Sequence, residues 1–114
     1  MKYPHRTCLF KETAQEYGYK LASFQGHEFS LRVSASPSLD DVEAFAVTVY
    51  YSLSTRENVE IARVDTAHGF THFDRLYRRD QPKEPVEWDW QKAEEELREN
   101  WRRYAKSYDD AYGL

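Results

Sequence analysis

The chain has 114 residues, a length that favours one domain with its own core, spanning residues 1–114. Its net charge of −4 at pH 7 argues against a surface that coats nucleic acid or anionic membrane without specificity. The single cysteine, Cys8, excludes an internal disulfide framework, and no apolar run reaches the length of a membrane span, so we expect a soluble, cytoplasmic protein.

An antiparallel sheet of four or five strands is predicted within residues 19–79, where apolar and polar residues alternate. The most apolar stretch, residues 43–53, is expected to be a central strand that is covered on both faces. The first 18 residues are assigned to an N-terminal arm, in which residues 13–17 could form a helical turn that Gly18 ends. The strands are expected at residues 19–25, 27–35, 43–53, 58–66 and 70–78.

One long helix is predicted at the C-terminal end of the chain. Residues 80–87 form a linker, because their two prolines exclude a strand interior. The helix follows over residues 88–112, with Asp89 as a plausible N-cap and Gly113 at its end. The expected fold class is therefore α+β: a meander packed against one long C-terminal helix.

Apolar and aromatic residues recur at steps of three and four along this helix and predict a stripe that packs on the sheet. At about 1.5 Å per residue the helix is about 36 Å long, against about 17 Å for a five-residue strand. Its tyrosine-rich end is therefore expected to extend beyond the sheet as a candidate partner contact. The stripe consists of Trp90, Ala93, Leu97, Trp101, Tyr104, Tyr108 and Tyr112.

Residues 63–75 concentrate more titratable side chains than any other segment, with two carboxylates, two histidines and two arginines around Gly69. A β-hairpin is predicted here, with its turn at residues 67–69 and Gly69 at the position of positive φ. If Asp65 lies opposite His72, alternation determines the remaining register. The expected pairs are Asp65–His72, Arg63–Asp74 and Ile61–Leu76 on one face, with Val64–Phe73 and Ala62–Arg75 on the other.

This cluster suits acid–base chemistry at a phosphodiester, since a histidine beside a carboxylate can move a proton and an arginine can hold phosphate. The same residues could instead ligate a divalent metal such as Zn²⁺ or Mn²⁺. In the structural alternative, Arg63–Asp74 is an ordinary cross-strand ion pair and Asp65 caps the turn. The catalytic candidates are Asp65, His68, His72 and Asp74, and the substrate-binding candidates are Arg63, Arg75, Arg78 and Arg79.

The hairpin and the helix that follows resemble the TumE family of small proteins from toxin–antitoxin pairs. Thr66 stands where that family usually has Asn, and Asp74 stands where it usually has a second His. The resemblance implies functional roles for Asp65 and His72, a toxin-like activity on RNA, and silencing by a small DNA-binding antitoxin. The matching residues are Val64-Asp65-Thr66, His68-Gly69 and His72-Phe73-Asp74-Arg75.

Two hypotheses of different kinds follow. The first is a metal-independent ribonuclease that uses the hairpin cluster, and it requires the side chains of the four catalytic candidates to converge. The second is a non-catalytic interaction or regulatory protein that dimerises, or binds a partner, through its aromatic C-terminal helix. The basic residues of that helix, Arg102, Arg103 and Lys106, are assigned to a solvated face because the helix charges are mixed.

Overall fold

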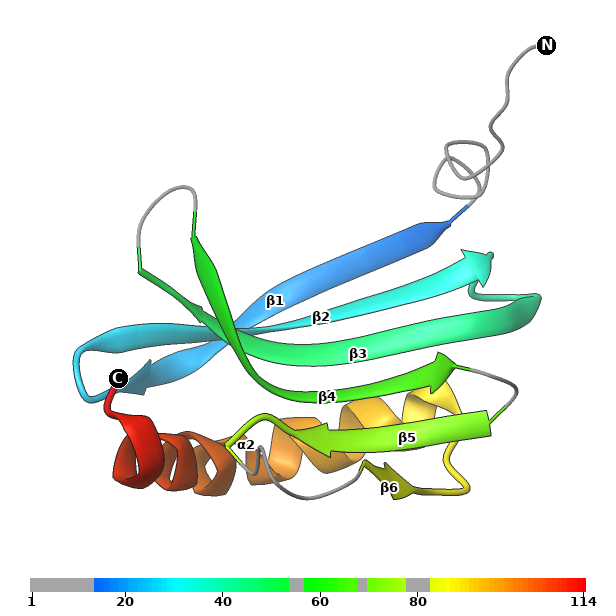
Figure 1. Cartoon of the computed structure of the whole chain (residues 1–114). Helices are drawn as coiled ribbons and strands as arrows, with labels where there is room; N and C mark the ends of the chain where they lie inside the picture. Colours follow the sequence, from blue (N-terminus) through cyan, green and yellow to red (C-terminus); the bar gives the residue numbers. More distant parts are fainter. Residues whose placement is uncertain (1–13, 54–56, 68–69, 78–82) are drawn as a thin grey trace, which may run out of the picture.

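Among the residues that the structure describes, six strands form one sheet, in which each strand is antiparallel to the next along the chain, and one helix packs against it (Figure 1). The predicted α+β meander with a C-terminal helix is confirmed, with six strands in place of four or five. The computed structural model describes residues 14–53, 57–67, 70–77 and 83–114. The elements are β1 Gln15–Phe24, β2 His27–Pro37, β3 Val42–Ser52, β4 Asn58–Ala67, β5 Phe70–Arg75, β6 Glu84–Pro85 and α2 Trp90–Tyr112.

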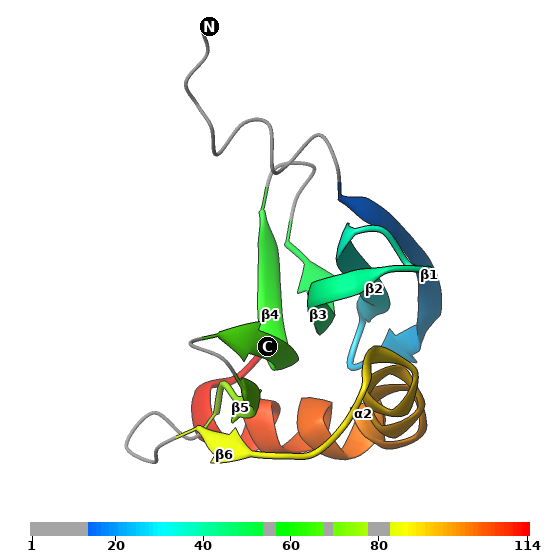
Figure 2. The same ribbon diagram turned by 90° about the vertical axis from the view of Figure 1, so that its right-hand side faces the viewer.

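The sheet curves around α2, which lies on its concave side (Figure 2). We call the face that contacts α2 the inner face and the opposite face the outer face. Three shifts of register interrupt the ladders, and each leaves one residue of a strand without a counterpart: Leu21 in β1, Glu43 in β3 and Ile61 in β4. Because such bulges bend a strand and increase its twist, they account for part of the curvature.

The core lies between the inner face and α2, as the helical stripe predicts. Trp101 packs on Phe29 with ring centroids 5.1 Å apart, and Tyr104 packs on Phe73 at 5.6 Å. The helix contributes its buried side chains Ala93, Leu97, Trp101, Tyr104 and Ala105. The sheet contributes Phe29, Leu31, Val33, Ala35, Phe45, Val47, Val49, Tyr51, Ile61, Ala62, Val64 and Phe73. The stripe is therefore explained by core packing.

The ends of α2 are set by local hydrogen bonds. The Asp89 side chain accepts a 2.8 Å bond from the backbone N–H of Lys92, which confirms it as the N-cap. Gly113 has φ of 80°, and its N–H donates to the carbonyl of Asp109 at 2.8 Å. Within the described chain, no helix combines the length and apolar composition that crossing a bilayer requires.

The prediction that α2 extends beyond the sheet is wrong, because strands β2 and β3 are 11 residues long, about twice the assumed length. At about 3.3 Å per residue they match a helix of 23 residues. Tyr108 accordingly packs on Tyr51, with ring centroids 6.4 Å apart. Trp90 and Tyr108 are partly buried, and Tyr112, at 43%, is the most exposed residue of the stripe.

The N-terminal part of the sheet starts earlier than predicted. β1 includes residues 15–18, so the helical turn expected there is wrong. The reason is tertiary, since the hydroxyls of Tyr17 and Tyr19 both donate to Glu94 of α2. Gly18 is a strand residue opposite Arg32, and a Cβ there would lie 2.9 Å from the carbonyl oxygen of Leu31.

Part of the predicted linker is a strand. Glu84 and Pro85 form the short strand β6, which pairs with Phe73 and His72. Pro85 is tolerated because β6 is an edge strand, where a missing N–H costs no ladder bond. At the centre of the sheet, β3 lies between β2 and β4, as the predicted meander requires. The expected cover on both faces is wrong: α2 lies on the inner face, and on the outer face Ala44, Ala46 and Tyr50 are partly exposed, although Thr48 is only 1% exposed.

Candidate functional site

Strands β4 and β5 form the predicted hairpin, joined by residues 68–69. Its register is the predicted one, with Asp65 opposite His72 and Arg63 opposite Asp74. His68, a catalytic candidate, and Gly69, with its expected positive φ, lie outside the described residues. Of the four catalytic candidates, the structure therefore places three.

These residues belong to two cross-strand rows on the outer face, which we call the outer-face cluster. Directly opposed side chains in a sheet have Cβ atoms about 4.5–5.5 Å apart, so neighbours in a row are within reach of each other. The rows are His72–Asp65–Ala46–Ser34 and Asp74–Arg63–Thr48–Arg32. Asp65 and His72 thus face each other directly, and Asp74 lies one row away.

Ile61 was predicted on the same face as Arg63 and Asp65, and this placement is wrong. The bulge at Ile61 shifts the register by one residue, so Tyr50 of β3 lies opposite Glu60. Ile61 is fully buried in the core, and the Glu60 carboxylate reaches Arg63. A charged residue therefore extends the cluster where an apolar one was expected.

The two arginines of the hairpin lie on opposite faces, as alternation predicts. Arg75 is on the inner face, where its guanidinium lies 4.2 Å from the centroid of the Phe73 ring. It also donates a 2.6 Å hydrogen bond to Glu84. Arg63 and Arg75 therefore do not converge on one phosphate, and their roles as substrate-binding residues stay predictions. Arg78 and Arg79 lie outside the described residues.

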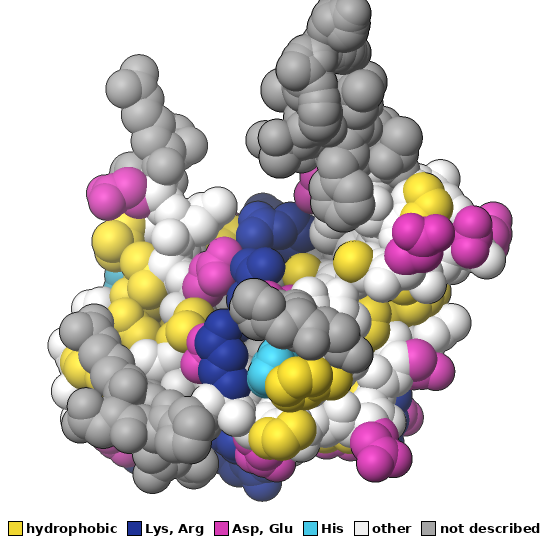
Figure 3. Space-filling model, turned by 45° about the vertical axis from the view of Figure 1, so that its right-hand side comes forward, with side chains coloured by type: hydrophobic (Ala, Val, Ile, Leu, Met, Phe, Trp, Pro, Cys, Tyr) yellow, Lys and Arg dark blue, Asp and Glu magenta, His cyan; other side chains and the backbone are white. Residues whose placement is uncertain are grey.

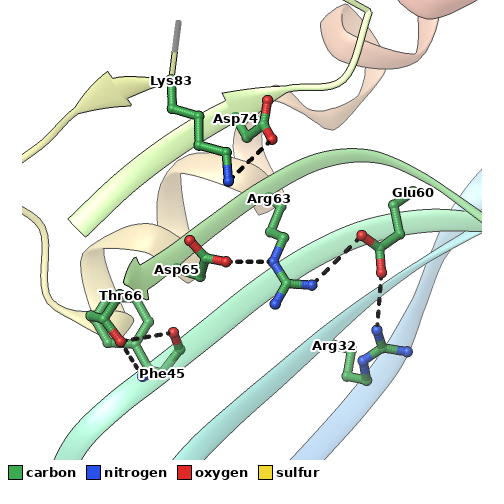
Figure 4. Close-up of polar contacts among 8 residues, drawn as sticks. All are labelled: Arg32, Phe45, Glu60, Arg63, Asp65, Thr66, Asp74 and Lys83. Atoms are coloured by element: carbon green, nitrogen blue, oxygen red, sulfur yellow. Dashed lines mark hydrogen bonds and ion pairs between the residues drawn. The ribbon is translucent and has the colours of Figure 1, made fainter. Parts of the chain in front are cut away.

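A chain of ion pairs runs along the outer face (Figure 4). The Nε of Arg63 donates to Asp65 at 2.7 Å, and the two oxygens of Glu60 lie 3.6 Å from Arg63 and 3.5 Å from Arg32. Asp74 is 3.9 Å from the ammonium group of Lys83. The Arg63–Asp74 ion pair of the structural alternative is therefore wrong, because both residues are engaged elsewhere. Asp65 binds Arg63 and does not cap the turn through a described contact.

His72 is half-buried, and its Nδ1 is buried without a hydrogen-bond partner among the described residues. Its ring contacts that of Phe70 at a centroid distance of 4.3 Å, and Phe70 is 53% exposed. A buried nitrogen without a partner destabilises the fold by about 1–3 kcal/mol, which is a reason to look for a functional role. Figure 3 shows a histidine beside a band of Lys and Arg side chains on this side of the molecule.

A shallow hollow of about 160 Å³ adjoins this cluster. Its floor is formed by small side chains of β2 and β3, and one of them, Ala46, lies directly opposite Asp65. The lining residues are Ala14, Ser34, Ser36, Ala44, Phe45 and Ala46. Asp65 does not itself line the hollow and is connected to it through its cross-strand neighbour Ala46.

A metal site is not preformed in the described part of the chain, where no three His, Cys, Asp or Glu side chains are grouped to hold an ion. Asp65 is bound to Arg63, and Asp74 lies near Lys83. The metal hypothesis therefore depends on His68, which is outside the described residues.

The whole sheet, the hairpin and α2 fall within one family match. A family model described as a domain of unknown function, DUF7718, matches residues 12–114. The chain belongs to the DUF7718 family. No match was found among the curated proteins or among the solved structures. The DUF7718 description names no activity, so the resemblance to the TumE family stays a prediction.

Three residues that contact the outer-face cluster were not among the predicted site residues: Arg32, Glu60 and Phe70. Arg32 lies on β2 and reaches Glu60 of β4 across β3, a contact that depends on the strand order β2-β3-β4. The sequence did not place Glu60 on the outer face, because the bulge at Ile61 reverses the alternation that a regular strand would have. Phe70 is exposed, and its ring contacts that of His72. The two residues are two positions apart on one strand, a spacing that places their side chains on the same face and that was visible in the sequence.

Proposed function

We propose that this protein is a toxin-like, metal-independent ribonuclease whose working surface is the outer face of the β4–β5 hairpin. One observation carries the proposal: His72, with its buried and unpartnered Nδ1 among the described residues, lies directly opposite Asp65, whose other cross-strand neighbour, Ala46, lines a hollow. A histidine facing a carboxylate at a surface open to ligand is suited to general acid–base catalysis.

Cleavage of a phosphodiester requires one group that takes a proton from the attacking hydroxyl and another that gives one to the leaving oxygen. His72 performs one of these steps in this proposal. Asp65, which faces the ring across the hairpin, orients the imidazole or shares the proton transfer. His68 is the second acid–base candidate by its place in the sequence. Asp74, in the next row and near Lys83, acts only in support.

Arg63 and Arg32 are the phosphate-binding groups of this surface. Both are paired with Glu60, but at 3.6 and 3.5 Å these contacts are longer than good N–H···O hydrogen bonds. Donors on both guanidinium groups are therefore available to a phosphate, which would bind in a charge-assisted and two-pronged manner. The exposed ring of Phe70 supplies a surface on which a base can stack.

A small DNA-binding antitoxin is the partner that this function implies, following the resemblance to the TumE family. The alternative, an interaction protein that associates through its aromatic helix, finds less support. The stripe of α2 packs on the sheet as far as Tyr108, and Tyr112, at 43%, is its most exposed member. Substitution of Tyr112 by alanine, followed by light scattering, tests association through that end.

The deciding experiment compares the wild type with His72→Gln and His27→Gln. His27 is the matched control, because it is the other described histidine and packs on Tyr51 away from the outer face. Purified proteins are incubated with single-stranded RNA in EDTA, and the wild type is induced in a heterologous host alongside each variant. We expect RNA cleavage and growth arrest with the wild type and His27→Gln, and a loss of about 10²-fold or more with His72→Gln.

If the two variants have the same circular dichroism spectrum and the same unfolding midpoint, the loss of cleavage in His72→Gln results from the missing imidazole and not from unfolding. Cleavage by His72→Gln at the wild-type rate, or no cleavage by the wild type, would overturn the proposal. Growth arrest by both variants without RNA cleavage would indicate a toxic binding surface instead.

A further inference from the structure

A second hollow, of about 270 Å³, lies between the end of β5 and the C-terminal half of α2. It belongs to the inner side of the molecule, since Arg75 contacts Phe73 there and Tyr104 is part of the core. The sheet separates it from His72 and Asp74, whose side chains are on the outer face. The lining residues are Arg75, Tyr77, Arg103, Tyr104 and Ser107.

The lining is suited to an oxyanion, because every one of these side chains carries a hydrogen-bond donor and none is a carboxylate. Arg103 and Ser107 lie four positions apart on α2 and so face the same side of the helix. Arg75 approaches from β5, so donors from two elements meet at one hollow.

The charge of the hollow is positive. Arg75 is paired with Glu84 at 2.6 Å, whereas no carboxylate pairs with Arg103 among the described residues. Burial raises the pKa of Tyr104, and the guanidinium groups of Arg103 and Arg75 act against this rise, whereas Glu96 adds to it. Glu96 forms an ion pair with Lys92 and does not line the hollow, so Arg103 is the lining charge without a paired carboxylate among the described residues.

Contacts with Phe73 and Glu84 hold the Arg75 side chain in position, which favours the binding of an anion by its guanidinium group. Its guanidinium lies over the Phe73 ring at 4.2 Å and is bound by Glu84 from the side. An arginine restrained in this way loses little side-chain freedom when it binds a phosphate. A volume of about 270 Å³ corresponds to about nine water molecules, more than a bare phosphate needs.

The geometry points to a phosphate-binding site in this hollow, in which Arg75 and Arg103 hold the phosphate of a nucleotide and Tyr104 and Ser107 donate to its oxygens. The phosphate belongs either to a free nucleotide or to an RNA chain. The site lies on the other face from the outer-face cluster, so it stands or falls independently of the ribonuclease proposal.

The test is calorimetric titration of the full-length protein at low salt with inorganic phosphate, a nucleoside 5′-monophosphate and a single-stranded RNA oligonucleotide. The variant is Arg103→Ala, and the matched control is Arg102→Ala. Arg102 is the adjacent exposed arginine of α2, but it lies over the Trp101 ring at 4.7 Å and does not line the hollow. The RNA titrations are made with His72→Gln and with the same arginine substitutions in that background, because the ribonuclease proposal expects the wild type to cleave the oligonucleotide.

We expect phosphate binding to weaken about tenfold in Arg103→Ala and to remain unchanged in Arg102→Ala and His72→Gln. Tighter binding of the mononucleotide than of RNA, lost in Arg103→Ala, supports the site and identifies a free nucleotide as its ligand. The reverse order with the same Arg103 dependence supports the site and identifies an RNA chain. Equal weakening in Arg102→Ala, or no binding of any of the three probes to the wild type, would overturn the inference.

Discussion

Tyr19 donates a 2.6 Å hydrogen bond to Glu94, which joins β1 to α2 across 75 positions of the sequence. The other oxygen of the same carboxylate accepts a 2.9 Å bond from Tyr17. One acidic side chain of the helix thus holds two residues of the edge strand. This contact explains why β1 is a strand from Gln15 onward, although local sequence did not predict it.

Replacing Tyr19 with phenylalanine removes this hydrogen bond while keeping the ring. We expect the free energy of unfolding to fall by about 1 kcal/mol, because a partly exposed hydrogen bond to a charged group has a modest net value. Urea unfolding followed by circular dichroism measures it. Tyr50→Phe, on the outer face, is the control and should change stability by less than about 0.5 kcal/mol. An equal loss in both variants would contradict the prediction.

Alkaline pH should weaken the fold through Tyr17. Burial, followed by the hydrogen bond to Glu94, raises the pKa of Tyr17 to about 12 from an unfolded value of 10.0. The folded state therefore favours the protonated phenol, and this stability is complete below pH 10 and is lost as pH rises toward 12. Urea unfolding at pH 9 and pH 11.5 should show a smaller decrease for Tyr17→Phe than for the wild type. If the unfolding free energy of the two proteins falls equally between these pH values, the loss of stability is due to tyrosines other than Tyr17.

Gly18→Ala should destabilise the protein even though alanine usually suits a strand better than glycine. The added Cβ would meet the Leu31 carbonyl oxygen at 2.9 Å, which forces β1 away from β2. We expect a loss of about 1–3 kcal/mol, the range of overpacked sites. Ser23→Ala, also in β1 and exposed, is the control in the same denaturation experiment. Stabilisation by Gly18→Ala would show that the strands adjust without strain.

The N-cap of α2 offers a prediction that concerns the helix alone. Asp89→Ala removes the acceptor of the Lys92 N–H and should lower stability by about 1 kcal/mol. Glu87→Ala, an exposed substitution just before the cap, should have little effect. Thermal unfolding of the two variants measures this difference. Equal unfolding midpoints would show that the Asp89 cap does not stabilise the helix.

Much of the fold was predictable because its signals are local. Alternation located β2, β3 and the β4–β5 hairpin, and the spacing of Leu97, Trp101 and Tyr104 identified the buried stripe of α2. Asp89 and Gly113 marked the helix ends through hydrogen bonds that span a few residues. These features depend on neighbours in sequence, so sequence alone suffices to find them.

The remainder depends on contacts between distant segments. The start of β1 requires Glu94, and the strand at Glu84–Pro85 requires the exposed edge of β5. In the candidate site, the Asp65–His72 pairing followed from the hairpin register and is confirmed. The partners of Arg63 did not follow from it, since one of them, Glu60, reaches the outer face only through the bulge.

Because of the bulge at Ile61, β4 can lose one residue without a change in which of its side chains face the core. In most of β4, loss of one residue would turn every later side chain to the opposite face and move Arg63 and Asp65 into the core. Ile61 has no counterpart on β3, so its removal leaves Glu60 opposite Tyr50 and the following residue opposite Val49. The chain can thus shorten at this one position while the outer-face cluster keeps its orientation, at the expense of a buried isoleucine and some of the curvature around α2.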